Sequence, residues 1–205
     1  MKISVSILKE KDDFINAIEK LNNTSTDYIH LDIMDSTFTK NSSFDLNDFY
    51  NISTKKYDIH IMSTNLDYQI NEAIKLNPEF ITLHYESTNS IIKYINLIKE
   101  NNIKVGLAVS PNTDIDKIKE YLSLVDLVLI MSVEPGLGGQ EFILDTVNKL
   151  KELNKLKSKF LISVDGGINN ETYKYVKDYV DIVVCGSYIT NSDNYEEKIN
   201  TIRNN

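Results

Sequence analysis

The sequence predicts an α/β protein, a single-domain (β/α)8 TIM barrel that spans residues 1–205. Two observations support this fold class: short apolar runs alternate with amphipathic helical patterns along the chain, and polar side chains gather where several of those runs end. Strands that alternate strictly with helices build parallel sheets, and eight such units in 205 residues fit a compact closed barrel. An open doubly wound sheet is the alternative, but it accounts less well for eight strands, and no G-x-G-x-x-G motif follows the first run.

Eight short runs rich in β-branched and other apolar residues are the expected strands. They cover residues 3–8, 28–33, 57–62, 80–84, 104–109, 127–132, 161–164 and 182–185. Between them, apolar residues recur at helical spacing, as Phe14, Ile15, Ile18 and Leu21 do in the first pattern. The helices expected from this spacing cover residues 13–21, 90–100 and 146–156, with shorter ones at 113–122, 171–177 and 194–202.

Composition excludes several classes of protein. A net charge of −8 argues against a nucleic-acid partner, because such proteins present a basic surface. No apolar stretch approaches the ~20 residues of a membrane span, and the N-terminus has no signal-peptide pattern. The single cysteine, Cys185, excludes an intramolecular disulfide and is typical of the reducing cytoplasm. We therefore expect a cytoplasmic protein with a small-molecule substrate. The sequence leaves open whether the protein forms a homo-oligomer.

Two of the three histidines lie at the ends of consecutive strands, where each is followed two residues later by a carboxylate or a methionine. Alternate residues of a strand share one face, so His30 and Asp32 point the same way, opposite a purely apolar face. His60 ends the next strand, Asp165 ends a later one, and barrel enzymes place their active sites at this end of the strands. These four side chains are candidate ligands of one divalent metal ion (Zn, Fe(II), Mn or Co), because mixed imidazole and carboxylate ligands suit all four ions. Buried hydrogen-bonded pairs are the alternative interpretation.

Glycine is scarce, and six of its seven residues lie in three loops that follow strands. Repeated glycines leave backbone N–H groups free to point at an anion, and the loops after strands seven and eight are the usual phosphate site of such barrels. The sequence therefore predicts a phosphate site formed by these loops. Its residues are Gly136, Leu137, Gly138 and Gly139, then Gly166 and Gly167, then Gly186 and Ser187.

The third histidine, His84, ends the fourth strand within Ile81-Thr82-Leu83-His84-Tyr85-Glu86. It has two interpretations of equal weight: a lining residue of the same pocket, or a structural residue held by hydrogen bonds. Met34, Met62 and Met131 also lie near strand ends, and for each of them a filler of core gaps is the favoured interpretation.

Several of these motifs together resemble the ribulose-phosphate 3-epimerase family. They occur in the family's order and spacing from the first strand to the last, so the resemblance covers nearly the whole chain. The segment after the sixth strand is the most specific of them. The motifs are Ser6-Ile7-Leu8, His30-Leu31-Asp32-Ile33-Met34-Asp35, His60-Ile61-Met62, Met131-Ser132-Val133-Glu134-Pro135-Gly136-Leu137-Gly138-Gly139-Gln140, Val164-Asp165-Gly166-Gly167-Ile168 and Gly186-Ser187.

The resemblance implies a metal-dependent isomerase that epimerises C3 of a ketopentose phosphate. It implies that His30, Asp32, His60 and Asp165 bind the metal and that Asp32 and Asp165 are also the catalytic acid/base pair. It further implies that Ser6 and His60 contact the substrate, together with Asp165 and the three glycine loops. Chemistry supports this assignment, because epimerisation needs one group to remove a proton beside the carbonyl and another to return a proton to the opposite face.

The loops after the first three strands depart from the family's pattern. Ser36 stands where a glycine is expected, the first loop reads Lys9-Glu10-Lys11-Asp12, and no proline follows Met62. These loops bear on substrate fit, so a 3-epimerase of a hexulose phosphate such as allulose 6-phosphate is an alternative, and a non-catalytic phosphosugar-binding barrel is another. A related decarboxylase or synthase is disfavoured, because no Asp-x-Lys-x-x-Asp run occurs.

Overall fold

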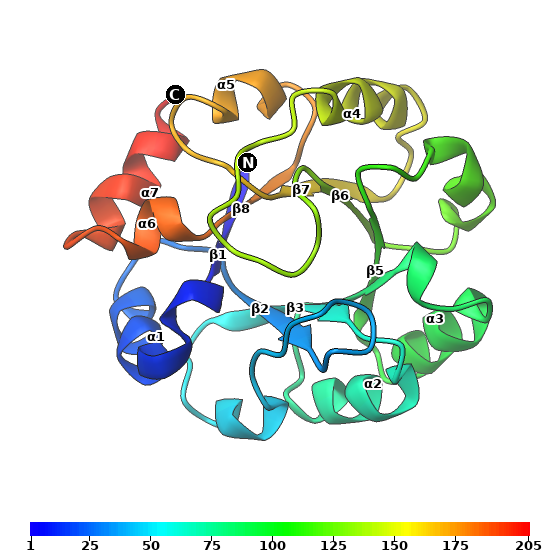
Figure 1. The fold of residues 1–205 in the computed structure, drawn as a ribbon, viewed down its shortest axis with the longest axis horizontal. Helices are drawn as coiled ribbons and strands as arrows, with labels where there is room; N and C mark the ends of the chain where they lie inside the picture. The colour runs from blue at the N-terminus through cyan, green and yellow to red at the C-terminus, as the bar shows by residue number, and fades with distance from the viewer.

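A computed structural model describes residues 1–205, which form a closed barrel of parallel strands in the order β1 to β8. Figure 1 shows the barrel surrounded by helices, with the N-terminus at the inside and the C-terminus at the rim. The predicted fold class and all eight predicted strands are confirmed, with ends that differ by at most two residues. The strands are β1 (Lys2–Ser6), β2 (Tyr28–Met34), β3 (Lys56–Met62), β4 (Phe80–His84), β5 (Lys104–Val109), β6 (Leu127–Met131), β7 (Leu161–Asp165) and β8 (Ile182–Cys185).

Helices and short 3-10 turns (η) connect the strands. None of these helices has the length and apolar character needed to cross a membrane. The α-helices are α1 (Phe14–Asn22), α2 (Leu66–Lys75), α3 (Ile91–Glu100), α4 (Thr146–Lys155), α5 (Tyr173–Val176), α6 (Ser187–Thr190) and α7 (Tyr195–Arg203). The 3-10 segments are η1 (Leu8–Asp13), η2 (Leu46–Phe49), η3 (Tyr85–Ser87) and η4 (Ile115–Tyr121).

Three connections differ from the sequence-based expectation, one of them by the short helix α6, which was not predicted. Helix α2 was not predicted, because its buried stripe has few apolar residues, chiefly Leu66, Ile70 and Ala73, among many polar ones. The segment expected as a helix at 113–122 is the 3-10 segment η4. Its buried residues Ile115 and Ile118 are three apart, a spacing that a three-residue turn places on one side.

The main hydrophobic core lies between the barrel and its helices. The outward faces of β2 and β3, with Ile29, Leu31, Ile33, Ile59 and Ile61, belong to this core, as the alternating pattern predicted. The inward faces form layers across the barrel. The layer at the amino ends of the strands is apolar and consists of Tyr28, Phe80, Leu127 and Ile182, which come from alternate strands.

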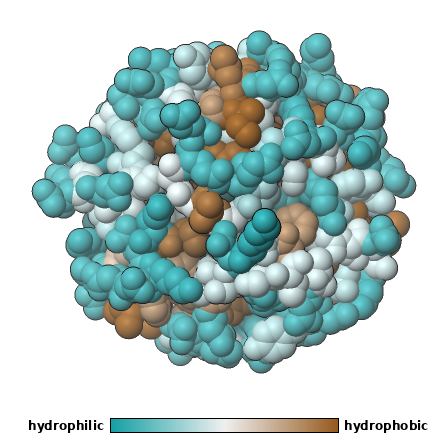
Figure 2. Space-filling view, viewed as in Figure 1, coloured by the Kyte–Doolittle hydropathy of each residue, from teal (hydrophilic) through white to brown (hydrophobic).

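The inward-facing residues become polar toward the carboxyl ends of the strands. Buried Ser4, Asp58, Thr82 and Ser163 follow the apolar layer, and the histidines and aspartates of the predicted site lie nearer the mouth. The apolar residues visible from this side in Figure 2 occur in separate groups among hydrophilic ones. The inside of the barrel is therefore apolar at its amino end, whereas at its carboxyl end the polar side chains lie together with a second apolar cluster of Ala108, Leu129, Met131, Val133 and Val184.

Candidate active site

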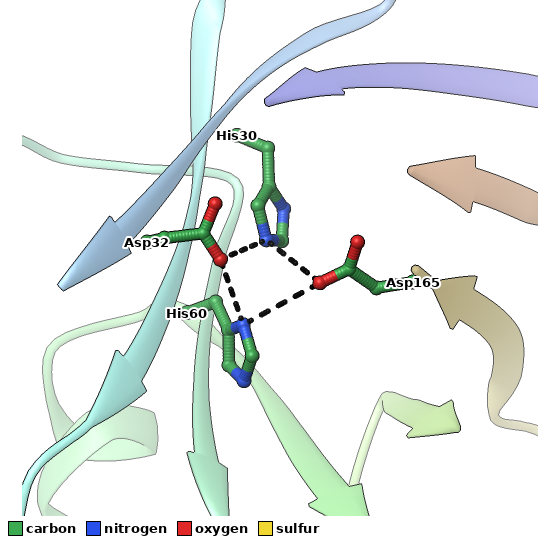
Figure 3. A group of neighbouring side chains, drawn as sticks. All are labelled: His30, Asp32, His60 and Asp165. Atoms are coloured by element: carbon green, nitrogen blue, oxygen red, sulfur yellow. Dashed lines mark hydrogen bonds and ion pairs between the residues drawn. The ribbon is translucent and has the colours of Figure 1, made fainter. Parts of the chain in front are cut away.

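The four predicted metal-binding side chains converge at one point inside the barrel mouth (Figure 3). Nε2 of His30 lies 3.4 Å from Oδ1 of Asp32 and 3.9 Å from Oδ2 of Asp165. Nδ1 of His60 lies 3.2 Å from the same Asp32 oxygen and 3.9 Å from the same Asp165 oxygen. One nitrogen or oxygen from each residue lies within 4.8 Å of all the others, so the group could hold a metal ion.

Strand register explains how residues distant in sequence meet there. His30 and Asp32 are alternate residues of β2, and Asp32 is paired with His60 of β3. Asp165 is the last residue of β7, paired with Met131 of β6, and reaches the group from another part of the barrel wall. Barrel closure, rather than any local motif, brings its carboxylate to the two histidines.

The hydrogen bonds of His30 aim one ring nitrogen at the group. Nδ1 of this fully buried ring lies 2.8 Å from Oδ2 of Asp58, which also accepts a 2.8 Å hydrogen bond from the Ser4 hydroxyl. A carboxylate can only accept, so Nδ1 carries the proton in the neutral ring and Nε2 has the lone pair. Nε2 has no hydrogen-bond partner although it is buried, which suits a nitrogen that ligates a metal.

A second chain of hydrogen bonds orients His60. Its Nε2 lies 2.9 Å from Nε2 of His84, and Nδ1 of His84 lies 3.1 Å from Oε2 of Glu86. If Glu86 accepts from His84 and His84 accepts from His60, Nδ1 of His60 has a lone pair for a cation held between it and Asp32. Without a cation, the 3.2 Å hydrogen bond to Asp32 requires a proton on Nδ1. His84 therefore has the second of the two roles that the sequence left open: it is a fully buried, hydrogen-bonded support of His60 and does not line the cavity above the group.

The electrostatics of the group favour a bound positive charge. Burial raises the pKa of Asp165 to about 7, and the neighbouring Asp32 carboxylate adds to this increase. Burial also opposes the charged form of Asp32, but the contacts with His30 and His60 outweigh it and hold the pKa of Asp32 well below its usual range. For His30, burial disfavours the charged ring, yet the carboxylates of Asp58 and Asp32 raise its pKa well above the ordinary value. Protons occupy the group when no cation does.

A cavity of about 570 Å³ opens above this group. Asp32 and Asp165 line its floor, and Ser6 joins them, because its hydroxyl donates a 2.7 Å hydrogen bond to Asp32. Every residue predicted to contact the substrate lines this cavity except His60, whose ring is fully buried beneath it. The other lining residues from that prediction are Gly136, Leu137, Gly138, Gly139, Gly166, Gly167, Gly186 and Ser187.

Glycines allow the loops around the cavity to pack closely. Gly166 has a φ of +119°, and a Cβ on it would lie 2.5 Å from a Val133 methyl group. Gly167 has a φ of +65°, and a Cβ there would lie 2.6 Å from the backbone nitrogen of Phe142. The loop after β6, which crosses the barrel mouth in Figure 1, therefore packs directly on the loop after β7.

Three residues near the site were not predicted as part of it. Asp58 lies on the same strand face as His60, so alternation alone could have identified it. Glu86 follows His84 by two residues, and its hydrogen bond to His84 was not predicted. Lys9 lines the cavity, and its position depends on how the first loop folds against the glycine loops, which no local pattern reveals.

Solved structures of other enzymes share the fold. The structure of 3-hexulose-6-phosphate synthase from Salmonella typhimurium has a TM-score of 0.68 at 17% identity, covering 100% of this chain and 97% of that chain. Thiamine phosphate pyrophosphorylase from Pyrococcus furiosus also has a TM-score of 0.68, at 14% identity, covering 99% of this chain and 94% of that chain. At these identities the likeness concerns the barrel fold alone.

Sequence comparisons are more specific. Residues 2–190 match the model of the ribulose-phosphate 3 epimerase family. The ribulose-phosphate 3-epimerase of Buchnera aphidicola subsp. Baizongia pistaciae is 38% identical over 88% of this chain and 84% of its own length. The enzymes of that name from Helicobacter pylori strain J99 and Bacillus subtilis are 33% and 31% identical, over 100% and 99% of this chain and 97% and 98% of their own lengths. The chain therefore belongs to the ribulose-phosphate 3-epimerase family.

Proposed function

We propose that this protein is an isomerase that interconverts D-ribulose 5-phosphate and D-xylulose 5-phosphate, a reaction of the pentose phosphate pathway (EC 5.1.3.1). The observation that carries the proposal is the pair of carboxylates, Asp32 and Asp165, on the floor of one cavity whose rim is formed by glycine loops. Family membership supports the same activity. Cytoplasmic location, predicted from the single cysteine, is part of this proposal.

The reaction inverts C3 of the sugar, which lies next to the C2 carbonyl. One carboxylate removes the C3 proton from one face, the electron pair moves into an enediolate, and the other carboxyl returns a proton to C3 on the opposite face. Asp32 and Asp165 come from β2 and β7 and enter the cavity from different sides. Their shared environment favours one ionised and one protonated carboxyl, the state that such an exchange needs. In the reverse direction the two exchange roles.

In this proposal His30, Asp32, His60 and Asp165 also hold one divalent metal ion. The site fits such an ion: it offers two imidazole nitrogens and two carboxylates, and the buried Nε2 of His30 lacks any other partner. Mixed nitrogen and oxygen ligands suit Zn, Fe(II), Mn or Co. When bound, the ion supplies Lewis-acid stabilisation of the negative charge that develops on the substrate oxygens.

The glycine loops and Ser6 position the sugar phosphate. Backbone N–H groups of residues 136–139, 166–167 and 186–187 bind the phosphate, which places C3 of the sugar over the two carboxylates. Ser6 donates to Asp32 and lies beside Gly186, since a Cβ on that glycine would lie 3.7 Å from the Ser6 hydroxyl. Ser6 thus connects the acid/base pair to the phosphate loops.

The test measures whether the proton at C3 exchanges with solvent during turnover. In D2O, ribulose 5-phosphate should become xylulose 5-phosphate that carries deuterium at C3, which proton NMR detects. Allulose 6-phosphate, assayed in parallel, identifies a preference for hexulose phosphates. Product without deuterium at C3 would refute the exchange of protons between the carboxyl groups and solvent, and the absence of any turnover with the metal-loaded protein would refute the enzyme assignment.

A further inference from the structure

One cationic side chain lines the cavity, and neither the metal group nor the acid/base pair uses it. The charged residues of the cavity wall are Lys9, Asp32, Glu141 and Asp165. Three are carboxylates, and the whole chain has a net charge of −8, so the surroundings repel an anionic substrate. Lys9 is the one positively charged side chain that a phosphate meets on the wall of this cavity.

Lys9 lies against the glycine loop after β6. A Cβ on Gly138 would lie 3.2 Å from Cγ of Lys9, so the aliphatic part of the side chain packs on this loop. A Cβ on Gly139 would lie 3.8 Å from Nζ of Lys9 and equally 3.8 Å from the hydroxyl oxygen of Ser187. The ammonium group and the Ser187 hydroxyl therefore both lie close to Gly139.

The ammonium group of Lys9 has no partner in the protein. It makes no hydrogen bond, ion pair or cation–π contact, whereas Lys11 on the same segment bonds to the carbonyl of Ser42 at 3.3 Å. Lys149 shows what a structural lysine looks like here, since it donates to three backbone carbonyls, including that of Thr113 at 2.6 Å. Lys9 has the contacts that hold its stem in place and a charge that no neighbouring group neutralises.

We propose that Lys9 binds the phosphate group of the substrate, together with Gly138, Gly139 and Ser187. This inference rests on the proposed function and extends it. A sugar phosphate carries close to two negative charges at neutral pH, and an ammonium group binds it as a point charge. Because Asp32 and Asp165 occupy the floor, the Lys9 end of the cavity is where the phosphate is stabilised. Lys9 thereby sets the direction in which the substrate enters.

The experiment compares Lys9→Met with Lys9→Arg and with Lys11→Met, which removes the same charge two residues away. In Lys9→Met the KM for ribulose 5-phosphate should rise about 10- to 100-fold, as for loss of a hydrogen bond to a charged group, while kcat changes little. Lys9→Arg should restore most of the affinity, and Lys11→Met should resemble the wild type. Lys9 is exposed, so these variants should keep the melting temperature of the wild type.

Binding of inorganic phosphate, measured by titration calorimetry, gives a readout that needs no turnover. Lys9→Met should lose affinity for phosphate in proportion to its increase in KM. A fall in phosphate affinity in a protein without epimerase activity would support the role of Lys9 and refute only the proposed reaction. Unchanged KM and phosphate affinity in Lys9→Met would overturn the inference, as would a decrease in kcat alone or an equal loss in Lys11→Met, which would indicate a general charge effect.

Discussion

The two ends of the barrel interior use opposite solutions to the same packing problem. At the amino ends of the strands, Tyr28, Phe80, Leu127 and Ile182 fill the barrel with apolar side chains. At the carboxyl ends, two histidines and two aspartates lie inside the barrel, beside the apolar side chains of Leu129, Met131 and Val184. An apolar layer needs only suitable volumes, whereas each buried polar atom of the other layer needs a partner. One end therefore contributes stability, and the other carries chemistry that burial makes costly.

The polar end meets this requirement through supporting residues. Asp58 accepts from both His30 and Ser4, and Glu86 accepts from His84 and from the backbone nitrogen of Ser110 at 2.9 Å. Nε2 of His30 remains without a hydrogen-bond partner, as do Oδ1 of Asp58 and the hydroxyl groups of Thr82 and Ser163 deeper in the barrel. A cation in the group would satisfy Nε2 of His30 and offset the repulsion between Asp32 and Asp165. The apolar end needs no ligand at all.

The largest expected effect separates chemistry from stability. Asp165→Asn removes one member of the acid/base pair, and kcat should fall by ~10²–10⁴-fold, as is typical for a general acid or base. The melting temperature of the metal-free variant should not fall, because a carboxyl opposed by burial is replaced by a neutral group of the same shape. Steady-state assays with metal analysis of the same sample measure this. A metal-loaded variant with near-normal kcat would contradict the two-carboxylate mechanism.

The reverse behaviour is expected at the apolar end. Phe80→Ala leaves a cavity in the lowest layer and should reduce the free energy of unfolding by about 3–5 kcal/mol. At low temperature, where the variant is folded, kcat and KM should match the wild type, because Phe80 does not line the active-site cavity. Urea denaturation measures the loss of stability, and steady-state assays on the same preparation measure kcat and KM. A large loss of kcat in the folded variant would show that the two ends are coupled.

The supporting residues should give an intermediate effect on metal affinity. Asp58→Asn weakens the acceptor that orients His30, and loss of such a partner typically costs about 10- to 100-fold in metal affinity. Once saturated with metal, the variant should recover most of its kcat, since Asp58 does not line the cavity. Competition with a chromogenic chelator measures the affinity. The control is Asp27→Asn, which changes a carboxylate that accepts a hydrogen bond from the backbone nitrogen of Ile3, at the end of β1 remote from the metal group. This variant should bind metal normally.

The sequence was sufficient to place the residues whose position follows from alternation along one strand. His30 and Asp32 share a face by the two-residue period, and the strand-end position of His60 and Asp165 followed from where apolar runs stop. The sequence did not predict which residues of different strands and loops contact one another. That Asp58 supports His30, that His84 contacts His60, and that Lys9 reaches the glycine loop all depend on register and loop packing across the barrel. The sequence pattern predicts which face of a strand a residue occupies. Its neighbours across the barrel are determined by how the barrel closes.

The smallest expected effect concerns pH and the metal-free protein. The pKa of Asp165 is raised to about 7, so its proton stabilises the folded chain at low pH, and this contribution is lost as pH rises through about 7. Between about pH 5 and 8, chelated wild-type protein should therefore lose stability relative to chelated Asp165→Asn.

Metal binding should reverse this trend, because a cation among these side chains favours the deprotonated forms of Asp165 and His30 and so competes with their protons. Metal affinity should fall as pH decreases below about 7, and binding at about pH 6 should release protons, detected by calorimetry in buffers of different ionisation enthalpy. The apolar layer contains no histidine or carboxyl group, and the cations that pack on it, Lys2 on Tyr28 and Lys104 on Phe80, are lysines, so Phe80→Ala should shift the stability equally at all these pH values. Metal affinity that is independent of pH would show that protons and the cation do not compete for these four side chains, and the contrast between the two ends would then rest on packing alone.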